Sequence, residues 1–312
     1  MMRRLLARIG QALVVLLAAF TLSFLLLQAL PADAILIKFM NPDLGLSPEQ
    51  IAEIHAAYGA GTPLWSQYLH TLGNFLTGDF GTSVQAGVPV RDSLAANLPA
   101  TLTLATFGFL TAVILALAVS FLSNLTGLAW LRNGLAALPS LFVSVPVFWL
   151  GILLIQVVSF QLKLVPVVDP GPWERLILPV AALAVPISAP LAQILMRNID
   201  AALTRPFVAV ARAKGASRHH VLWRHVVPNA LLPTLTIAGV LFGELLAGAV
   251  VTETVFGLNG LGTLTQQAVA NQDVAVLQAV VVISATAFVL INLAVDLVYP
   301  LLDPRIAQAD AR

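Results

Sequence analysis

Six long stretches of this sequence are almost free of charged side chains, and each is long enough to cross a lipid bilayer. A membrane-spanning helix needs about 20 apolar residues, because each residue advances the helix by about 1.5 Å. The stretches cover residues 9–30, 98–122, 136–160, 176–196, 229–252 and 274–298, and only Glu244 and Asp296 place a charge within them. Backbone amides in hydrocarbon must be satisfied internally, which favours helices, and the stretches lack the alternation of barrel strands. The sequence therefore predicts an all-α, polytopic membrane protein with six transmembrane helices in a single domain over residues 1–312.

The composition narrows the class of protein further. Hydrophobic residues make up 59% of the chain and charged residues 10%, whereas soluble domains have about 45–50% and about 25%. These values exclude a soluble enzyme, a disordered regulator and a nucleic-acid binder. The chain has no Cys, which excludes disulfides, thiolate catalysis and Cys-ligated metal sites. The first stretch is longer than the roughly 7–15 apolar residues of a signal peptide, so we interpret it as an uncleaved span.

The distribution of Lys and Arg predicts the orientation. With the N-terminus inside, twelve bases fall in inner segments and four in outer ones, which places both termini in the cytoplasm. The inner bases are Arg3, Arg4, Arg8, Arg132, Arg197, Arg205, Arg212, Lys214, Arg218, Arg224, Arg305 and Arg312, and the outer ones are Lys38, Arg91, Lys163 and Arg175.

The segment 31–97 is predicted to lie outside the membrane on the external face. It holds six acids and two bases, and it is too polar and too rich in Gly and Pro to be a span. Ser47 followed by Gln50 predicts a helix start, with a helix running to about Tyr58. The segment would either cap the outer mouth of the bundle or offer a docking surface to an external partner, and the two roles are compatible.

The loop 197–228 is the second polar region. Its residues 197–224 hold six bases and a single acid, Asp200. Pro206 favours the first turn of a helix, Gly215 favours a helix end, and Ser217 favours the start of a second helix. Two short amphipathic helices at the cytoplasmic face are therefore expected, although the charge alone would favour a basic loop held near anionic lipid headgroups.

The residues of this loop also resemble a known signature. The sequence Ala-Val-Ala-Arg-Ala-Lys-Gly at residues 209–215, with Pro228 thirteen residues after Gly215, resembles the EAA loop of ABC importer permeases. Ala209 stands where that signature has Glu, and the form with Arg224 and His225 resembles the dipeptide, oligopeptide and nickel subfamily. Other segments are similar to that subfamily in register: Gly-Asp-Phe-Gly-Thr-Ser at 78–83, Ser-Val-Pro-Val-Phe-Trp-Leu-Gly at 144–151, Glu-Thr-Val-Phe at 253–256 and Leu-Asp-Pro-Arg at 302–305.

The resemblance implies a permease subunit of a binding-protein-dependent ABC importer in the bacterial inner membrane. It implies four kinds of partner: a second homologous permease, two cytoplasmic ATPase subunits, an external substrate-binding protein and the lipid bilayer. The substrate would be a dipeptide, an oligopeptide, nickel or a metal chelate. The residues implied to contact the ATPases are Ala209, Ala211, Arg212, Lys214, Gly215, Ser217, Arg218, Arg224, His225 and Pro228.

The sequence predicts no catalytic residues, cofactor or metal for the chain itself. It has no Gly-x-x-x-x-Gly-Lys-[Ser/Thr] loop to wrap phosphates, so ATP and Mg²⁺ would be bound by the partner ATPases. Adjacent His219 and His220 point to different sides of a helix, and no carboxylate or Cys joins them and His225 in a metal site. The alternative of a secondary transporter working without an ATPase requires paired charges in the spans and inverted repeats, which we do not find.

Two further features lie within the spans. Gly239, Gly243 and Ala247 form a small-residue stripe suited to close packing against another span or a second permease. A charge such as that of Glu244 is unfavourable in a span unless it is paired or hydrated. Glu244 would therefore face the transport pathway or be a hydrogen-bonded structural residue. Pro139 and Pro146 should bend the third span.

Overall fold

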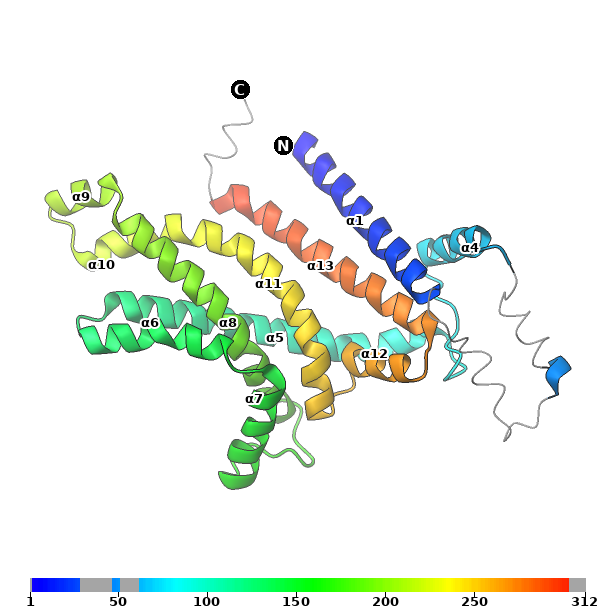
Figure 1. Cartoon of the computed structure of the whole chain (residues 1–312). Helices are drawn as coiled ribbons and strands as arrows, with labels where there is room; N and C mark the ends of the chain where they lie inside the picture. The colour runs from blue at the N-terminus through cyan, green and yellow to red at the C-terminus, as the bar shows by residue number, and fades with distance from the viewer. Residues whose placement is uncertain (1, 29–46, 51–61, 303–312) are drawn as a thin grey trace. The chain divides into compact units, whose positions relative to one another are not determined.

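The computed structural model describes residues 2–28, 47–50 and 62–302, and it is built of helices (Figure 1). The described residues contain an isolated bridge between Thr82 and Pro89 and no strand. In chain order the helices are α1 (Met2–Gln28), α4 (Leu64–Thr77), α5 (Val90–Leu125), α6 (Ala129–Val143), α7 (Val147–Leu154), the π-helix η2 (Ile155–Gln161), α8 (Glu174–Leu203), α9 (Pro206–Ala213), α10 (Arg218–Val221), the π-helix η3 (Leu222–Val226), α11 (Val227–Phe256), α12 (Leu261–Ala270) and α13 (Val274–Leu302). The prediction of an all-α membrane protein is confirmed.

Five of the predicted spans lie in single helices, namely α1, α5, α8, α11 and α13, each long and apolar enough to cross a membrane. The helices extend beyond the predicted bounds where the sequence stays compatible with a helix. α5 begins at Val90, so the last residues of the predicted external segment belong to this helix. α8 continues to Leu203, so residues 197–203 of the predicted loop are part of the span helix. Residues 29 and 30 of the first predicted span lie outside the described residues.

The third predicted span is broken rather than straight. α6 and the segment Val147–Gln161 meet at an angle of 104°. Pro146 has φ −62° and ψ 137° and starts α7, while Ser144 ends α6. A proline lacks the amide hydrogen and disfavours a helical residue before it, which explains the break at this position. The bend predicted at Pro146 is confirmed, whereas Pro139 lies inside α6 without breaking it.

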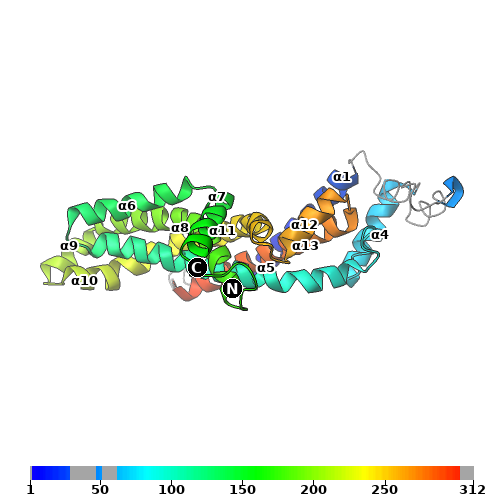
Figure 2. The same cartoon turned by 90° about the horizontal axis from the view of Figure 1, so that it is seen from below.

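The chain divides into two compact units, which we describe separately. The first contains residues 102–257 and the described residues from 290 onward. In this unit α8 packs against α11, α6 and α7, and Figure 2 shows α6 running beside α8. Leu183 of α8 is fully buried between Gly108 of α5 and Gly248 of α11. A Cβ atom added to Gly108 would lie 3.0 Å from the Leu183 side chain, and one added to Gly248 would lie 3.1 Å from it. The absence of side chains at these glycines lets α5 and α11 approach α8 closely.

The second unit contains the described residues up to 101 together with residues 258–289. Its interior is an apolar cluster that includes Val90, Leu94 and Ala279. Asp273 is buried before α13 and accepts hydrogen bonds from the Ser83 hydroxyl at 2.5 Å and from the Gln85 amide at 3.4 Å. These bonds attach the loop after α4 to the start of α13.

One motif of the resemblance and a nearby threonine have structural roles in this second unit. In the Gly-Asp-Phe-Gly-Thr-Ser motif, Gly78 has φ 81° and ends α4, and Asp79 accepts a hydrogen bond from the Gly81 amide at 2.9 Å. Thr101 accepts a hydrogen bond at 2.7 Å from the amide of Leu261, the first residue of α12. These hydrogen bonds fix the chain between helices.

The predicted helix start at Ser47 is confirmed. The Ser47 amide donates to the Gln50 side chain at 2.9 Å, and the Gln50 amide donates to the Ser47 hydroxyl at 3.3 Å. The continuation to Tyr58 lies outside the described residues. Helices α4 and α12 were not predicted from the sequence.

Candidate functional site

The two short helices α9 and α10 form where the sequence predicts them. Pro206 is the first residue of α9, where its fixed φ suits a helix and its missing amide hydrogen loses no bond. After α9 the Gly215 amide donates to Arg212 and the Ala216 amide to Ala211, at 2.9 and 3.1 Å. Gly215 has φ 84°, a conformation that favours glycine.

The second short helix begins at a side-chain cap. The Ser217 hydroxyl accepts a hydrogen bond from the His220 amide at 3.3 Å. This bond satisfies one of the amides that lack a partner at a helix start. The helix starts predicted at Pro206 and after Ser217 are therefore confirmed, but α10 is not a separate helix, because it runs on through η3 into α11 as one helix from Arg218 to Phe256. We call residues 206–221 the α9–α10 element.

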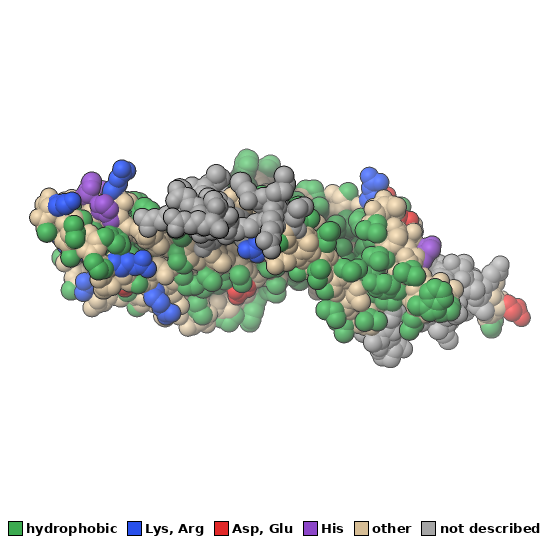
Figure 3. All heavy atoms as spheres, turned by 90° about the horizontal axis from the view of Figure 1, so that it is seen from above, with side chains coloured by type: hydrophobic (Ala, Val, Ile, Leu, Met, Phe, Trp, Pro, Cys, Tyr) green, Lys and Arg blue, Asp and Glu red, His purple; other side chains and the backbone are tan. Residues whose placement is uncertain are grey.

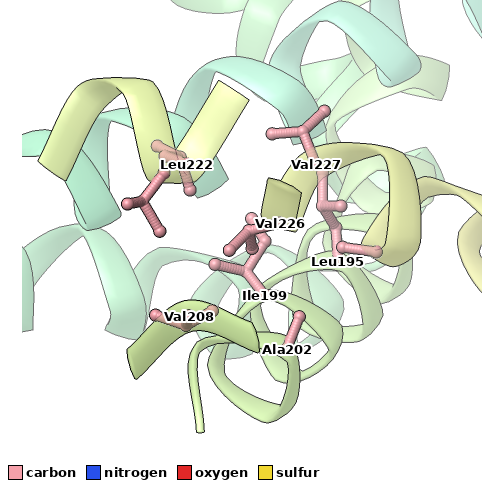
Figure 4. Close-up of a cluster of buried hydrophobic side chains, with 9 residues drawn as sticks. Leu195, Ile199, Ala202, Val208, Leu222, Val226 and Val227 are labelled. Atoms are coloured by element: carbon pink, nitrogen blue, oxygen red, sulfur yellow. The ribbon is translucent and has the colours of Figure 1, made fainter. Parts of the chain in front are cut away.

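A buried apolar cluster attaches this element to two of the long helices (Figure 4). It joins Val208 of α9 and Val221 of α10 to residues of α8, η3 and α11, each at most 7% exposed. The other members are Leu195, Ile199, Ala202, Leu222, Val226, Val227 and Ala230. Because interiors of this kind are close-packed, the cluster fixes the α9–α10 element on the ends of α8 and α11.

A third long helix, α5, is attached by polar and aromatic contacts. The Arg218 guanidinium donates a hydrogen bond to the main-chain oxygen of Asn124, in the last turn of α5. Carbonyls in the last turn of a helix have no partner within it and interact favourably with cations. Nearby, the rings of Phe121 and Trp223 lie 4.7 Å apart. The α9–α10 element therefore contacts the ends of three predicted spans.

The exposed surface of the element and of the adjoining η3 is basic. Arg212, Lys214 and Arg224 are exposed, and their side chains form no hydrogen bond or ion pair with the rest of the described chain. Figure 3 shows Lys, Arg and His side chains gathered at this end of the molecule. Val210 and Trp223 expose 54% and 43% of their surface beside these charges. A basic surface with apolar side chains suits a partner that has acidic side chains around an apolar groove.

The remaining residues predicted for this site also lie on the element or next to it. Ala209, Gly215, Ser217 and Pro228 are exposed, whereas Ala211 and His225 are half-buried. The rings of His220 and His225 are 5.8 Å apart. Among the described residues there is no group of three side chains suited to hold a metal ion.

The π-helix η3 between α10 and α11 is a feature that sequence reasoning missed. It places Trp223 and Arg224 on the exposed side while Leu222 and Val226 stay buried. π-helical turns are rare and frequently lie at functional sites. The sequence of this segment carries no pattern that distinguishes a π-helix from an α-helix.

The structure separates the small residues predicted to form one stripe on α11. Gly239 is buried against α13, where an added Cβ would lie 3.0 Å from the Asn292 side-chain oxygen. Gly243 is half-buried, and Ala247 is exposed.

Ala247 shares its exposed face of α11 with Glu244 and with Thr236, Val240 and Val251. Glu244 forms no hydrogen bond or ion pair with the rest of the described chain. A charge in a span is unfavourable unless it is paired or hydrated, and among the described residues Glu244 has no partner.

Comparison with known proteins identifies the family. Residues 108–308 match the family described as binding-protein-dependent transport system inner membrane component, and residues 1–105 match its N-terminal family. The chain is 35% identical to the probable peptide ABC transporter permease protein y4tP of Sinorhizobium fredii, over 91% of this chain and 92% of that one. It is 30% identical to the dipeptide transport system permease protein DppB of Escherichia coli, over 98% and 99% of the two chains.

Solved structures show a similar fold. The inward-facing MetNI methionine ABC transporter matches 67% of this chain and 96% of its own, with a TM-score of 0.55 and 20% identity. On these matches, the chain belongs to the inner-membrane permease family of binding-protein-dependent ABC importers and is a multi-pass protein of the bacterial inner membrane.

Proposed function

We propose that this chain is one of two permease subunits of a peptide importer, and that its α9–α10 element seats on a cytoplasmic ATPase. The partners in this proposal are a second homologous permease, two ATPase subunits that bind ATP and Mg²⁺, and an external substrate-binding protein. The chain itself contributes no catalytic residue and binds no cofactor. The observation that supports this most is the buried cluster joining the element to α8 and α11.

The proposed mechanism follows from this attachment. When the ATPases close on ATP, the α9–α10 element moves with the ATPase surface on which it is seated. The buried cluster and the bond from Arg218 to α5 carry that displacement to three spans. Closure thereby biases the bundle between inward-open and outward-open states, which is a shift between two populations.

The exposed face of α11 is the part of the chain that we assign to the transport pathway. Glu244 is the one ionisable residue of this face, and its neighbours Thr236 and Ala247 are small. A carboxylate facing lipid in a span would be strongly unfavourable. A hydrated pathway removes this cost and lets Glu244 interact with the positive charge of a peptide amino group.

The peptide class of substrate comes from the relatives, two of which are named as a peptide and a dipeptide permease. Nickel or a metal chelate is the other class compatible with the subfamily resemblance. Transport by the reconstituted complex, with its own binding protein and a panel of dipeptides, oligopeptides and nickel chelates, distinguishes these substrates.

Cross-linking tests whether the α9–α10 element contacts an ATPase subunit. The chain has no Cys, so a single Val210→Cys variant can carry a photoactivated cross-linker without background. We expect it to cross-link to an ATPase subunit in membranes that contain the whole transporter. Val168→Cys is the matched control, because Val168 is 81% exposed in the loop before α8 and should give no ATPase adduct. Solute transport by the purified chain alone, driven by an ion gradient, would instead establish the secondary transporter.

A further inference from the structure

Helix α4 carries an apolar stripe that no other described element covers. Trp65, Leu69 and Leu76 expose 69%, 57% and 79% of their surface, and Leu72 between them is half-buried. Their spacing of four, three and four residues places them on one face of the helix. Isolated exposed apolar residues are ordinary, but a continuous stripe of this size indicates an interaction surface.

A neighbouring side of α4 is held on α1 by aromatic side chains. The ring of Tyr68 lies 5.6 Å from that of Phe20 and 5.4 Å from that of Phe24, and Phe75 lies 5.2 Å from Phe20. The hydroxyl groups of Tyr68 and Thr21 are hydrogen-bonded at 2.8 Å. Both helices belong to the same unit, and Figure 1 shows α4 beside the C-terminal end of α1.

The contacts with α1 fix the depth of α4 relative to a membrane. The apolar span within α1 covers Ala7–Leu27. Phe24 and Phe20 precede Leu27 by three and seven residues, which is about 4.5 and 10.5 Å along the helix axis. Side chains packed there lie at the depth to which interfacial helices are buried, about 5–10 Å. At the same level α1 exposes Leu22 and Leu26 by 60% and 69%, as expected of a surface covered by lipid.

The polar residues of α4 form a separate face. Ser66, His70, Asn74 and Thr77 follow one another at spacings of four, four and three residues, and the side chains of Asn74 and His70 lie 3.3 Å apart. We propose that α4 is an interfacial helix that lies in the membrane surface at the C-terminal end of α1. Its stripe of Trp65, Leu69 and Leu76 is embedded among lipid acyl chains, and its polar face is turned to water.

In this arrangement lipid covers the apolar stripe of α4, which agrees with the chemistry of its side chains. Trp is favoured at the level of the lipid headgroups, and apolar residues on one face with polar residues on the other are typical of helices in the interface. The lipid surface beside α1 is continuous with the stripe, because the exposed leucines of α1 lie at the same depth. Since α4 ends at Gly78, the anchored helix also holds the following loop at the membrane surface.

Spin labelling of the whole transporter tests the proposal. Single Cys residues replace Trp65, Leu69 or Leu76 in one set of variants, and His70, Asn74 or Thr77 in a matched set on the same helix. The transporter is placed in nanodiscs of phosphatidylethanolamine and phosphatidylglycerol, and each label is exposed to oxygen, which partitions into lipid, or to a water-soluble nickel chelate. We expect the ratio of oxygen to nickel collisions to be several-fold higher at positions 65, 69 and 76 than at 70, 74 and 77.

Two results would overturn the proposal. A higher nickel accessibility along the stripe would show that it faces water, and protection from both reagents would show that another protein covers it. A second measurement leaves the stripe intact: Trp65 is retained while the other four Trp residues are replaced by Phe. Brominated lipids should quench its fluorescence, and the absence of quenching would also contradict lipid contact.

Discussion

The guanidinium of Arg218 donates a hydrogen bond to the main-chain oxygen of Asn124, 94 residues earlier in the chain. Arg218 begins α10, and Asn124 lies in the last turn of α5. One of the basic residues expected to contact an ATPase is therefore used within the chain, where it holds the α9–α10 element on a span. The exposed bases that remain for a partner are Arg212, Lys214 and Arg224.

Replacing Arg218 and Arg212 in turn should distinguish attachment of the α9–α10 element to α5 from binding of the ATPase. Arg218→Ala should lower the free energy of unfolding by about 1 kcal/mol, because a hydrogen bond from a charged donor is lost at a partly solvated position. Arg212→Ala should leave the unfolding free energy unchanged and weaken co-purification of the ATPases. Thermal unfolding and quantitative co-purification measure the two effects. Identical behaviour of the two variants would show that Arg218 has no separate role in the bundle.

The conformation of Gly215 predicts a graded series of variants. An added Cβ at Gly215 would have no atom within 4 Å, so only its φ of 84° opposes a side chain. Gly215→Asn should retain coupling, because Asn tolerates this region. Gly215→Val should impair it, and Gly215→Pro should abolish it, because proline requires φ near −65°. All three should insert into membranes. Normal ATPase co-purification and transport in the proline variant would refute the role of this turn.

Two valines of α9 provide a matched test of the buried cluster. Val208 is 2% exposed and Val210 is 54% exposed. Val208→Ala should lower the free energy of unfolding by about 2 kcal/mol, from lost apolar burial and a residual cavity. It should also raise the ATP hydrolysed per solute transported, because the element is held less firmly. Val210→Ala should leave the free energy of unfolding unchanged, because its side chain is exposed, and equal losses of stability at the two positions would contradict the packing of Val208 in the cluster.

Glu244 is predicted to affect transport without affecting assembly. Glu244→Gln should slow import of peptides roughly tenfold, equivalent to one charge-assisted hydrogen bond of about 1.5 kcal/mol. Glu174→Gln is the control, since Glu174 is exposed and accepts a hydrogen bond from the Gly171 amide at 2.9 Å. Transport in proteoliposomes and the subunit ratio of the purified complex are measured together. Loss of the second permease from the Glu244 variant would assign this residue to the subunit interface instead.

Asp273 should be the most sensitive polar position of the second unit. Asp273→Ala leaves the buried Ser83 hydroxyl and the Gln85 amide without their acceptor. The expected loss is about 2–3 kcal/mol of unfolding free energy, measured as a shift in the denaturation midpoint. Asp92→Ala, at an exposed position in the first turn of α5, should cost far less. Equal losses would show that burial of Asp273 contributes nothing.

The features that could be predicted from sequence are those decided locally. Five spans were recognisable because a long uncharged stretch in hydrocarbon has to form a helix to satisfy its backbone hydrogen bonds. The α9–α10 element was recognisable because Pro206, Gly215 and Ser217 each have a strong preference for their position at a helix end. In both cases the neighbouring residues alone determine the backbone.

The features that were missed depend on contacts distant in sequence. α4 is stabilised by aromatic rings of α1, and α12 by the hydroxyl of Thr101. Because these contacts come from distant residues, neither helix could be recognised from its own sequence. The spacing of Gly239, Gly243 and Ala247 could not show that Gly239 faces α13 while Ala247 is exposed. Pro146 predicted a bend, but its size of 104° is set by the packing of α6 and α7 on α8.

The bond between Ser83 and Asp273 has a consequence for synthesis of the chain. Its two residues are 190 positions apart, and ribosomes add about 5–20 residues per second. Ser83 therefore leaves the ribosome roughly 10–40 s before its acceptor exists. During that interval the loop after α4 lacks its attachment to the start of α13 and has to be held by other contacts.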